Sequence, residues 1–267
     1  MLPTFRHCAI TVEAGIATLC IQEAGPLNIL GTPVIRDVRD ALRSLHRDGS
    51  IRVAVLRGTG DRAFSGGADV KEMSALTPET AEAFIRGLHA LCDTVRRLPV
   101  PVIARIPGWC LGGALELVAS CDLRVAATGA RFAMPEIKVG IPSVIEATLL
   151  PRFVGAARAR LLVLTGDTID AQRAAEWGLV ETVVEPSRLD EEVGRIARLL
   201  ASHGPSAVRA QKTLLREWDE LPLDEATERS VDAFRAAYDS GEPQRYMQAF
   251  LSRQRAPGPA AGPHSPR

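Results

Sequence analysis

Two glycine-rich segments stand out because each lies where a strand pattern gives way to a helix pattern. The first covers residues 64–73 (FSGGADVKEM) and the second covers residues 107–117 (PGWCLGGALEL). Glycine lets a ligand approach the backbone closely, and the first N–H groups of a helix have no partner inside that helix. Two such N–H groups, at the positive ends of two helices, can converge on one oxygen as an oxyanion hole. Each segment taken alone fits an ordinary tight turn equally well.

Other familiar catalytic and nucleotide-binding motifs are missing from the sequence. Neither glycine segment has GxGxxG or GxxxxGK[ST] spacing, which argues against a Rossmann or P-loop site. The five histidines are scattered and lie in no HExxH or GxSxG context, so we interpret them as surface or capping residues. They are His7, His46, His89, His203 and His264.

Glu116 is the first acidic candidate for chemistry. It lies three residues after Gly113 in a stretch that is otherwise small and apolar. Residues three apart share a helix face, which predicts that this carboxylate lies near the Gly113 amide. A carboxylate is costly to bury unless it is paired, protonated or functional. A functional role is therefore favoured over a structural ion pair.

Two further acids lie downstream of the second glycine segment. Glu136 follows Pro135 among apolar neighbours, which indicates a loop, and an acid in a loop is by itself more often exposed than catalytic. Glu146 is a lone acid on a predicted helix and is most simply a salt-bridge partner.

The elements that must position these residues alternate between strands and helices. Apolar runs at residues 9–12 and 16–21 predict a β-hairpin. Residues 32–47 have helical spacing, with Thr32 as the N-cap and Pro33 at the first helical position. Further strands are predicted at residues 52–56, 100–106 and 122–126, and a further helix at residues 81–98. This alternation predicts an α/β fold with crossover connections.

The end of the chain has a different character, because no strand pattern occurs from residue 189 onward. Helical spacing covers residues 189–203, 205–218 and 223–238. We therefore expect a core of residues 1–187 and a helical region of residues 188–255. Residues 256–267 are rich in proline, glycine and alanine without any period, and we predict that they are disordered.

Composition narrows the class of protein. The chain has 267 residues, with 32 Lys and Arg balanced by 32 Asp and Glu, which argues against a nucleic-acid or membrane-surface partner. The 5 cysteines are odd in number and have no CxxC spacing, so neither a disulfide framework nor a zinc site is expected. Without a signal pattern or a long apolar stretch, the sequence predicts a cytoplasmic protein.

In this order, the two glycine segments and the two glutamates resemble the crotonase (enoyl-CoA hydratase/isomerase) superfamily. Residues 63–73 look like the first oxyanion-hole loop of that family, and residues 106–117, followed by Cys121 and Asp122, look like the second. The resemblance extends to about Arg255. It implies a spiral of ββα units and a C-terminal helical region that forms homotrimers, often paired into hexamers.

The resemblance also implies roles for particular residues. The N–H groups of Ala68 and Gly113 would hold the thioester oxygen of an acyl-CoA substrate, and Glu116 and Glu136 match the two glutamates of the hydratases. Phe250 resembles a C-terminal position that approaches the nucleotide. The implied substrate-binding residues are Gly66, Ala68, Asp69, Val70, Lys71, Gly113 and Phe250. Coenzyme A is part of the substrate, and neither a cofactor nor a metal is expected.

One segment departs from the family pattern. Where many hydratases have Pro-Gly-x-Gly-Gly, residues 140–148 read GIPSVIEAT, and Ala114 replaces a third glycine. We expect a differently shaped acyl pocket, and an inward-pointing Glu146 would alter the proton chemistry. The sequence favours an enoyl-CoA hydratase. An isomerase, which can run with Glu136 alone, other crotonase-type lyases and hydrolases, and a non-catalytic acyl-CoA-binding subunit stay open as alternatives.

Overall fold

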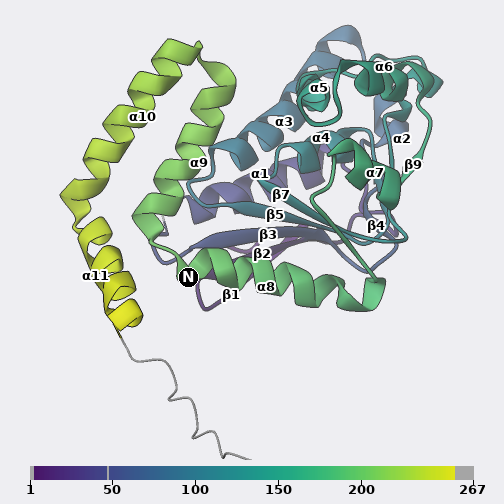
Figure 1. The fold of residues 1–267 in the computed structure, drawn as a ribbon. Coiled ribbons are helices and arrows are strands. Elements are labelled where there is room, and N and C mark those ends of the chain that lie inside the picture. The colour runs from purple at the N-terminus through teal and green to yellow at the C-terminus, as the bar shows by residue number, and fades with distance from the viewer. Residues whose placement is uncertain (1–2, 47, 256–267) are drawn as a thin grey trace, which may run out of the picture. The chain divides into compact units, whose positions relative to one another are not determined.

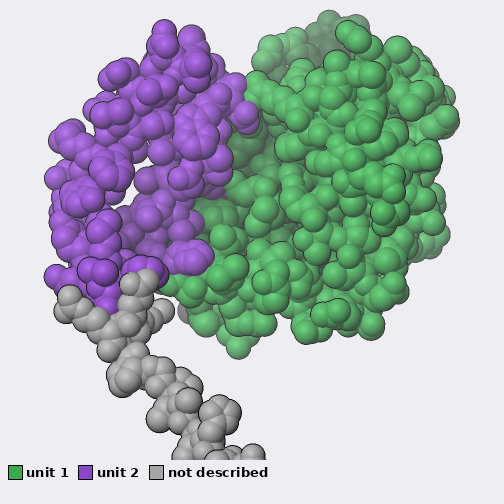
Figure 2. Space-filling view, in the orientation of Figure 1, with its two compact units in different colours: residues 1–202 green, residues 203–267 purple. Residues whose placement is uncertain are grey.

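The computed structural model describes residues 3–46 and 48–255. The chain divides into two compact units, residues 1–202 and residues 203–267, which Figure 2 colours separately. The predicted disordered tail, residues 256–267, lies outside the described residues. Helix α8 (Leu189–Ser202), which the sequence analysis grouped with the C-terminal helices, belongs to the first unit.

Two sheets form the framework of the first unit. The larger sheet has the strand order β1-β2-β3-β5-β7-β10, in which only β1 and β2 are antiparallel. Its strands are β1 (Cys8–Glu13), β2 (Ile16–Ile21), β3 (Val53–Gly58), β5 (Val102–Ile106), β7 (Leu123–Ala127) and β10 (Thr182–Val184). The smaller sheet joins β4 (Ala63–Ser65), β6 (Trp109–Leu111), β8 (Arg131–Ala133) and β9 (Ile169–Asp170) in that order.

The chain enters the two sheets alternately. Each of the pairs β3–β4, β5–β6 and β7–β8 places its first strand in the larger sheet and its second in the smaller one, and a helix follows. This confirms the predicted spiral of ββα units. The helices of its first half are α1 (Thr32–Leu45), α2 (Val70–Met73), α3 (Pro78–Arg97) and α4 (Gly113–Ala119).

Apart from β9, β10 and α8, the second half of the first unit consists of short helices, and of these the sequence analysis predicted only a helix at Glu146. They are η1 (Pro135–Val139), η2 (Ile145–Leu149), α5 (Leu150–Val154), α6 (Ala156–Thr165), α7 (Ala171–Trp177) and η3 (Pro186–Arg188). Four of these six helices span five residues or fewer. Helices of that length are too short to show a hydrophobic period in the sequence. The segment that carries Glu136 and Glu146 belongs to this irregular part.

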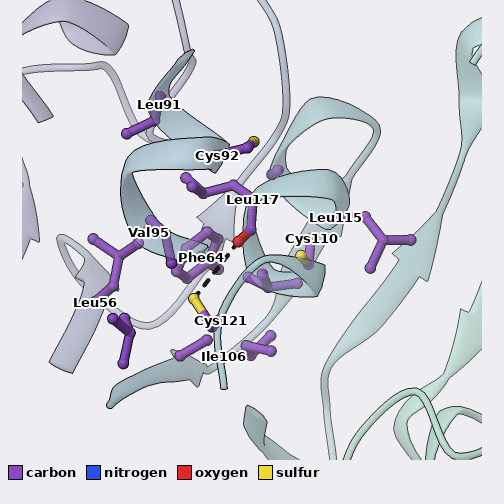
Figure 3. Packing of buried hydrophobic residues seen from close by; sticks show 14 of the residues in the cluster. Leu56, Phe64, Leu91, Cys92, Val95, Ile106, Cys110, Leu115, Leu117 and Cys121 are labelled. Carbon is purple, nitrogen blue, oxygen red and sulfur yellow. Dashed lines mark hydrogen bonds between the residues drawn. The ribbon is translucent and has the colours of Figure 1, made fainter. Parts of the chain in front are cut away.

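Both faces of the larger sheet are covered by helices (Figure 1). In β3, Ala54 and Leu56 point into the main core, whereas Val53 and Val55 belong to a second cluster with residues of α8. The alternation follows from the two-residue period of a strand. Figure 3 shows the main core, in which Phe64 packs among leucine, valine and cysteine side chains. Burial on both faces explains why these strands read as continuous apolar runs.

A buried arginine ties α8 to the sheet. Arg105 faces the second cluster because it alternates with Ala104 and Ile106, which point into the main core. Its Nε donates to Asp190 Oδ1 at 2.5 Å, and its Nη2 donates to Asp61 Oδ1 at 2.7 Å. These hydrogen bonds satisfy Nε and Nη2 of the buried guanidinium, whereas Nη1 has no partner among the described residues.

Two predicted helix starts were wrong by a short distance. The N-cap of α1 is Gly31, not Thr32, and the amide of Thr32 instead donates to Glu72 Oε2 at 2.9 Å. Helix α3 begins at Pro78 because Thr77 forms a capping box with Thr80. The predicted end of α1, Arg47, lies outside the described residues.

The second unit consists of α9 (Pro205–Glu220), α10 (Leu223–Ala237), η4 (Tyr238–Ser240) and α11 (Glu242–Arg255). The predicted helices at residues 205–218 and 223–238 are confirmed. Glu242 accepts hydrogen bonds from the amides of Ser206 and Ala207 and so closes the start of α9. In the part of the chain that the structure describes, no helix is long and apolar enough to cross a membrane.

Candidate active site

The two glycine segments line one cavity of about 160 Å³ in the first unit. Glu116 and Glu136 line the same cavity, so the structure brings both glycine segments and both predicted acids together. The remaining wall is mainly apolar and comes from α2, α3 and residues 139–144. It includes Val70, Met73, Phe84, Ile85, Leu88, Val139, Ile141 and Val144.

The first segment presents the Ala68 amide to the cavity. Residues on either side of Ala68 bond to the neighbouring chain: Leu30 N–H donates to Gly67 O at 2.9 Å, and Asp69 N–H donates to Leu30 O at 3.3 Å. These two hydrogen bonds form a parallel β-bridge between Leu30 and Ala68, in which the N–H of Ala68 itself has no acceptor among the described residues. Gly67 has φ +91, a conformation that side-chain-bearing residues rarely adopt.

The second segment presents the Gly113 amide. Gly112 has φ +53 and donates to Ala133 O at 2.9 Å, and Gly113 is the first residue of α4. As a first helical residue, Gly113 keeps its N–H outside the helix ladder, and no described residue accepts it. A Cβ built on Gly113 would lie 3.9 Å from the Ala68 nitrogen, which places the two amides close together.

Glu116 lies one turn into α4 and is 3% exposed. Its Oε1 accepts a hydrogen bond of 3.0 Å from the Ala147 amide in η2. Burial raises the pKa of Glu116 to about 8, the Ala147 amide opposes this shift, and the charges of Glu136 and Glu146 add to it. The carboxyl therefore keeps its proton at neutral pH.

Glu136 is held differently, in the 3₁₀-helix η1. Its Oε1 packs against the backbone of Gly112, where any Cβ would overlap it. Its Oε2 accepts a hydrogen bond of 3.2 Å from the Ser143 hydroxyl. Burial raises the pKa of Glu136, and its own backbone amide and Ser143 limit that rise.

Only some of the predicted substrate-binding residues line the cavity. Those that line the cavity are Gly66, Ala68, Val70 and Gly113. Asp69 and Lys71 do not line it: Asp69 caps α2 by accepting from the Lys71 and Glu72 amides at 2.9 and 3.1 Å, and Lys71 is exposed. Phe250 lies in α11 of the second unit with its side chain exposed, and its role stays a prediction.

Sequence reasoning missed most of the residues that hold the two acids. Ser143 and Ala147 lie in the segment that departs from the family pattern, and each donates to one of the acids. Glu146, the predicted salt-bridge partner, has its Oε1 2.8 Å from Nδ1 of His89, a contact that is a salt bridge when the imidazole is protonated. His89 is exposed, as the surface interpretation expected, but its contact with Glu146 was missed because no spacing in the sequence connects positions 89 and 146.

The chain is similar to proteins named as acyl-CoA hydratases over almost its full length. It is 32% identical over 253 residues to the crotonyl-CoA hydratase of Syntrophomonas wolfei, covering 94% of this chain and 97% of the relative. It is also 32% identical over 251 residues to the (E)-benzylidenesuccinyl-CoA hydratase of Thauera aromatica, covering 93% and 97%. These two relatives are named for different acyl groups, so the similarity selects no acyl group for this chain.

Among solved structures, an enoyl-CoA hydratase from Bacillus anthracis superposes with a TM-score of 0.89 at 30% identity, covering 93% of this chain and 97% of the other. The spiral of ββα units and the paired glycine segments thus define the crotonase class of fold. The sequence pattern of the enoyl-CoA hydratase/isomerase family matches residues 11–257. The chain belongs to the crotonase (enoyl-CoA hydratase/isomerase) family.

Proposed function

We propose that the protein is an enoyl-CoA hydratase that adds water across the 2,3 double bond of a 2-enoyl-CoA thioester. The observation that supports this most is that two amides and two carboxyls meet at one apolar cavity. A hydratase needs an acceptor for developing charge, a base for water and a proton source for the α-carbon. The cavity offers a candidate for each of these among its own amides and carboxyls.

The amides of Ala68 and Gly113 provide the electrostatic part of the mechanism. When water adds to the double bond, negative charge builds on the thioester oxygen. Two N–H groups that have no other acceptor among the described residues can receive that oxygen without first breaking other hydrogen bonds. By analogy with other oxyanion holes, each donor contributes about 2.7–4 kcal/mol of transition-state stabilisation.

The two glutamates provide the proton transfers. One carboxylate takes a proton from the attacking water, and the other carboxyl gives a proton to the α-carbon, so that the number of protons on the pair is conserved. Burial raises the pKa values of both acids above their ordinary range, and for Glu116 the value is about 8. A pKa near the working pH lets a carboxyl act in either direction.

The apolar side chains exposed on the second unit support a proposal about assembly. They include Leu223, which is 81% exposed, and Phe234, which is 68% exposed. Large apolar side chains in such numbers are typical of an interface. We propose that they pack against further copies of the chain in a homotrimer or homohexamer, and light scattering of the purified protein would measure that state.

The test of the activity uses crotonyl-CoA and a longer 2-enoyl-CoA. Loss of the conjugated double bond is followed by absorbance, and the product is identified by mass. We expect a gain of one water in the wild type and its loss in the Glu116→Gln and Glu136→Gln variants. No hydration of either substrate, despite measurable binding, would contradict the proposal. Assays of 3-enoyl-CoA isomerisation and thioester hydrolysis would then separate the alternative reactions, and binding without any reaction would indicate a non-catalytic subunit.

A further inference from the structure

A hydrogen-bonded pair of titratable side chains, Glu146 and His89, lies outside the set of residues that line the cavity. Glu146, on η2, is 3% exposed, and its Oε1 lies 2.8 Å from Nδ1 of His89 on α3. The His89 side chain is 52% exposed, so the pair reaches from solvent to the interior. Burial of a carboxylate costs free energy unless it is compensated, which makes Glu146 a residue that needs an explanation.

The backbone next to Glu146 contacts Glu116 directly. Ala147 is the next residue in the same 3₁₀ turn, and its N–H donates to Glu116 Oε1 at 3.0 Å. The position of Ala147 is therefore set by whatever holds Glu146. Ile145, the residue before Glu146, has φ +37, which is unfavourable for a β-branched side chain. A turn with that strain keeps its shape only when neighbouring contacts restrain it.

The charge of Glu146 also reaches Glu116. From α3, the groups that face Glu146 are His89, Cys92 and Arg96, and from α4 it is Glu116. The charged residue of α5, Arg152, is exposed. Burial raises the pKa of Glu146, and the contacts with His89, Cys92 and Arg96 limit that rise. An ionised Glu146 in turn contributes to the raised pKa of Glu116.

We propose that His89 and Glu146 are positioning residues for Glu116: their hydrogen bond fixes the η2 turn that presents the Ala147 amide, and a negative charge on Glu146 acts on the Glu116 carboxyl that accepts from that amide. This proposal rests on the proposed hydratase function, in which Glu116 is one of the two acids. It separates two effects that different variants can remove one at a time, namely the hydrogen bond and the charge.

The hydrogen bond is tested with His89→Ala, Glu146→Leu and His89→Asn. The first two remove the link between α3 and η2, and we expect kcat for crotonyl-CoA to fall about 10²-fold, as for a misplaced catalytic group, with KM nearly unchanged. Asparagine places an amide nitrogen near the position of Nδ1, so His89→Asn should recover most of kcat. Arg86→Gln is the matched control, because it breaks an exposed ion pair with Glu82 on the same helix.

The charge is tested with Glu146→Gln, which keeps an oxygen that accepts from His89. We expect its maximal kcat to stay within about 3-fold of the wild type, because the hydrogen bond and hence the Glu116 geometry are kept. The ionisation of Glu116 should shift to lower pH, because a neighbouring negative charge is gone. Difference infrared titration of the carboxyl bands, with Glu116→Gln to identify the band, measures that shift without any turnover.

The outcomes separate this proposal from the hydratase function. Wild-type kcat in both His89→Ala and Glu146→Leu, or an unshifted Glu116 titration in Glu146→Gln, would overturn it. Equal losses in His89→Ala and His89→Asn, with a matching drop in melting temperature, would show a purely structural role and also overturn it. If the wild type does not hydrate enoyl-CoA, the proposed function fails, and the infrared titration still decides whether Glu146 controls Glu116.

Discussion

The two acids of the cavity are held by opposite kinds of structure. Glu116 lies in the regular helix α4, all of whose residues are buried, and it makes one backbone hydrogen bond. Glu136 lies in a 3₁₀-helix with no fully buried residue, and it is fixed by a side-chain hydroxyl and by close packing on Gly112. A rigid helix therefore controls the first acid through burial, whereas the second depends on a few specific contacts. This difference determines how each responds to substitution.

The substitution with the largest expected effect is Gly112→Ala, because Gly112 joins the two regions. Its φ of +53 disfavours a side chain, and the added Cβ would overlap Glu136 Oε1. We expect a destabilisation of about 1–2 kcal/mol from the backbone conformation alone. Hydration of crotonyl-CoA should fall to background. Gly129→Ala is the matched control, since a Cβ there meets nothing within 4 Å. A Gly112→Ala enzyme with near-normal kcat would show that the contact between α4 and η1 is unimportant.

The next effect is the loss of either carboxyl. Glu116→Gln and Glu136→Gln should each lower kcat by about 10²–10⁴-fold, as expected for a lost general acid or base. Because Glu116 is controlled by burial, we predict that the Glu116→Gln variant folds at least as stably as the wild type near neutral pH. The substitution replaces a buried acid by a neutral group. Measuring kcat together with chemical denaturation separates these effects. If only one of the two variants loses activity, an isomerase that uses a single acid is the better interpretation.

The pH dependence of stability tests the burial of Glu116. In the unfolded chain this carboxyl ionises near 4.5, whereas in the fold its pKa is about 8. Between these values the unfolded state binds fewer protons, so raising the pH lowers the free energy of unfolding, by about 5 kcal/mol at most. Glu116→Gln should lose less stability than the wild type between pH 5 and 8. Parallel urea denaturation curves for the two proteins would contradict a buried, proton-retaining Glu116.

The smallest expected effect is that of Ser143→Ala. It removes the hydroxyl that donates to Glu136 Oε2 at 3.2 Å and leaves α4 untouched. Loss of a donor to a carboxylate raises its pKa, so the ionised form of Glu136 should require a higher pH. We expect a fall in kcat of about 3–10-fold, in line with about 1 kcal/mol for one hydrogen bond. Ser143→Thr keeps the hydroxyl and should retain activity, and a pH profile of kcat compares the three proteins.

The same contrast explains which parts of the molecule could be predicted from the sequence. The predicted elements have long or repeated apolar patterns, and the two glycine segments mark where strands meet helices. These elements are the strands β1, β2, β3, β5 and β7 and the helices α1, α3, α8, α9 and α10. The strands β4, β6 and β8 of the smaller sheet have three residues each and were missed. The contacts of Ser143, His89 and Glu146 leave no such pattern, since they join side chains that lie 7 and 57 residues apart in the sequence. The capping of α2 by Asp69 was missed because the resemblance to the family implied that Asp69 contacts the substrate.

The attachment of α8 has a consequence for how the protein forms during synthesis. Arg105 and Asp190 are 85 residues apart, and the second cluster joins Val53 and Ile103 to Leu189 and Val193. Until α8 has left the ribosome, one apolar face of the larger sheet has no cover and Arg105 has no Asp190. Contacts of such long sequence separation form late and leave the nascent chain open to aggregation. Truncation before α8 should therefore yield a chaperone-bound or insoluble product even though every active-site residue of the cavity is already present.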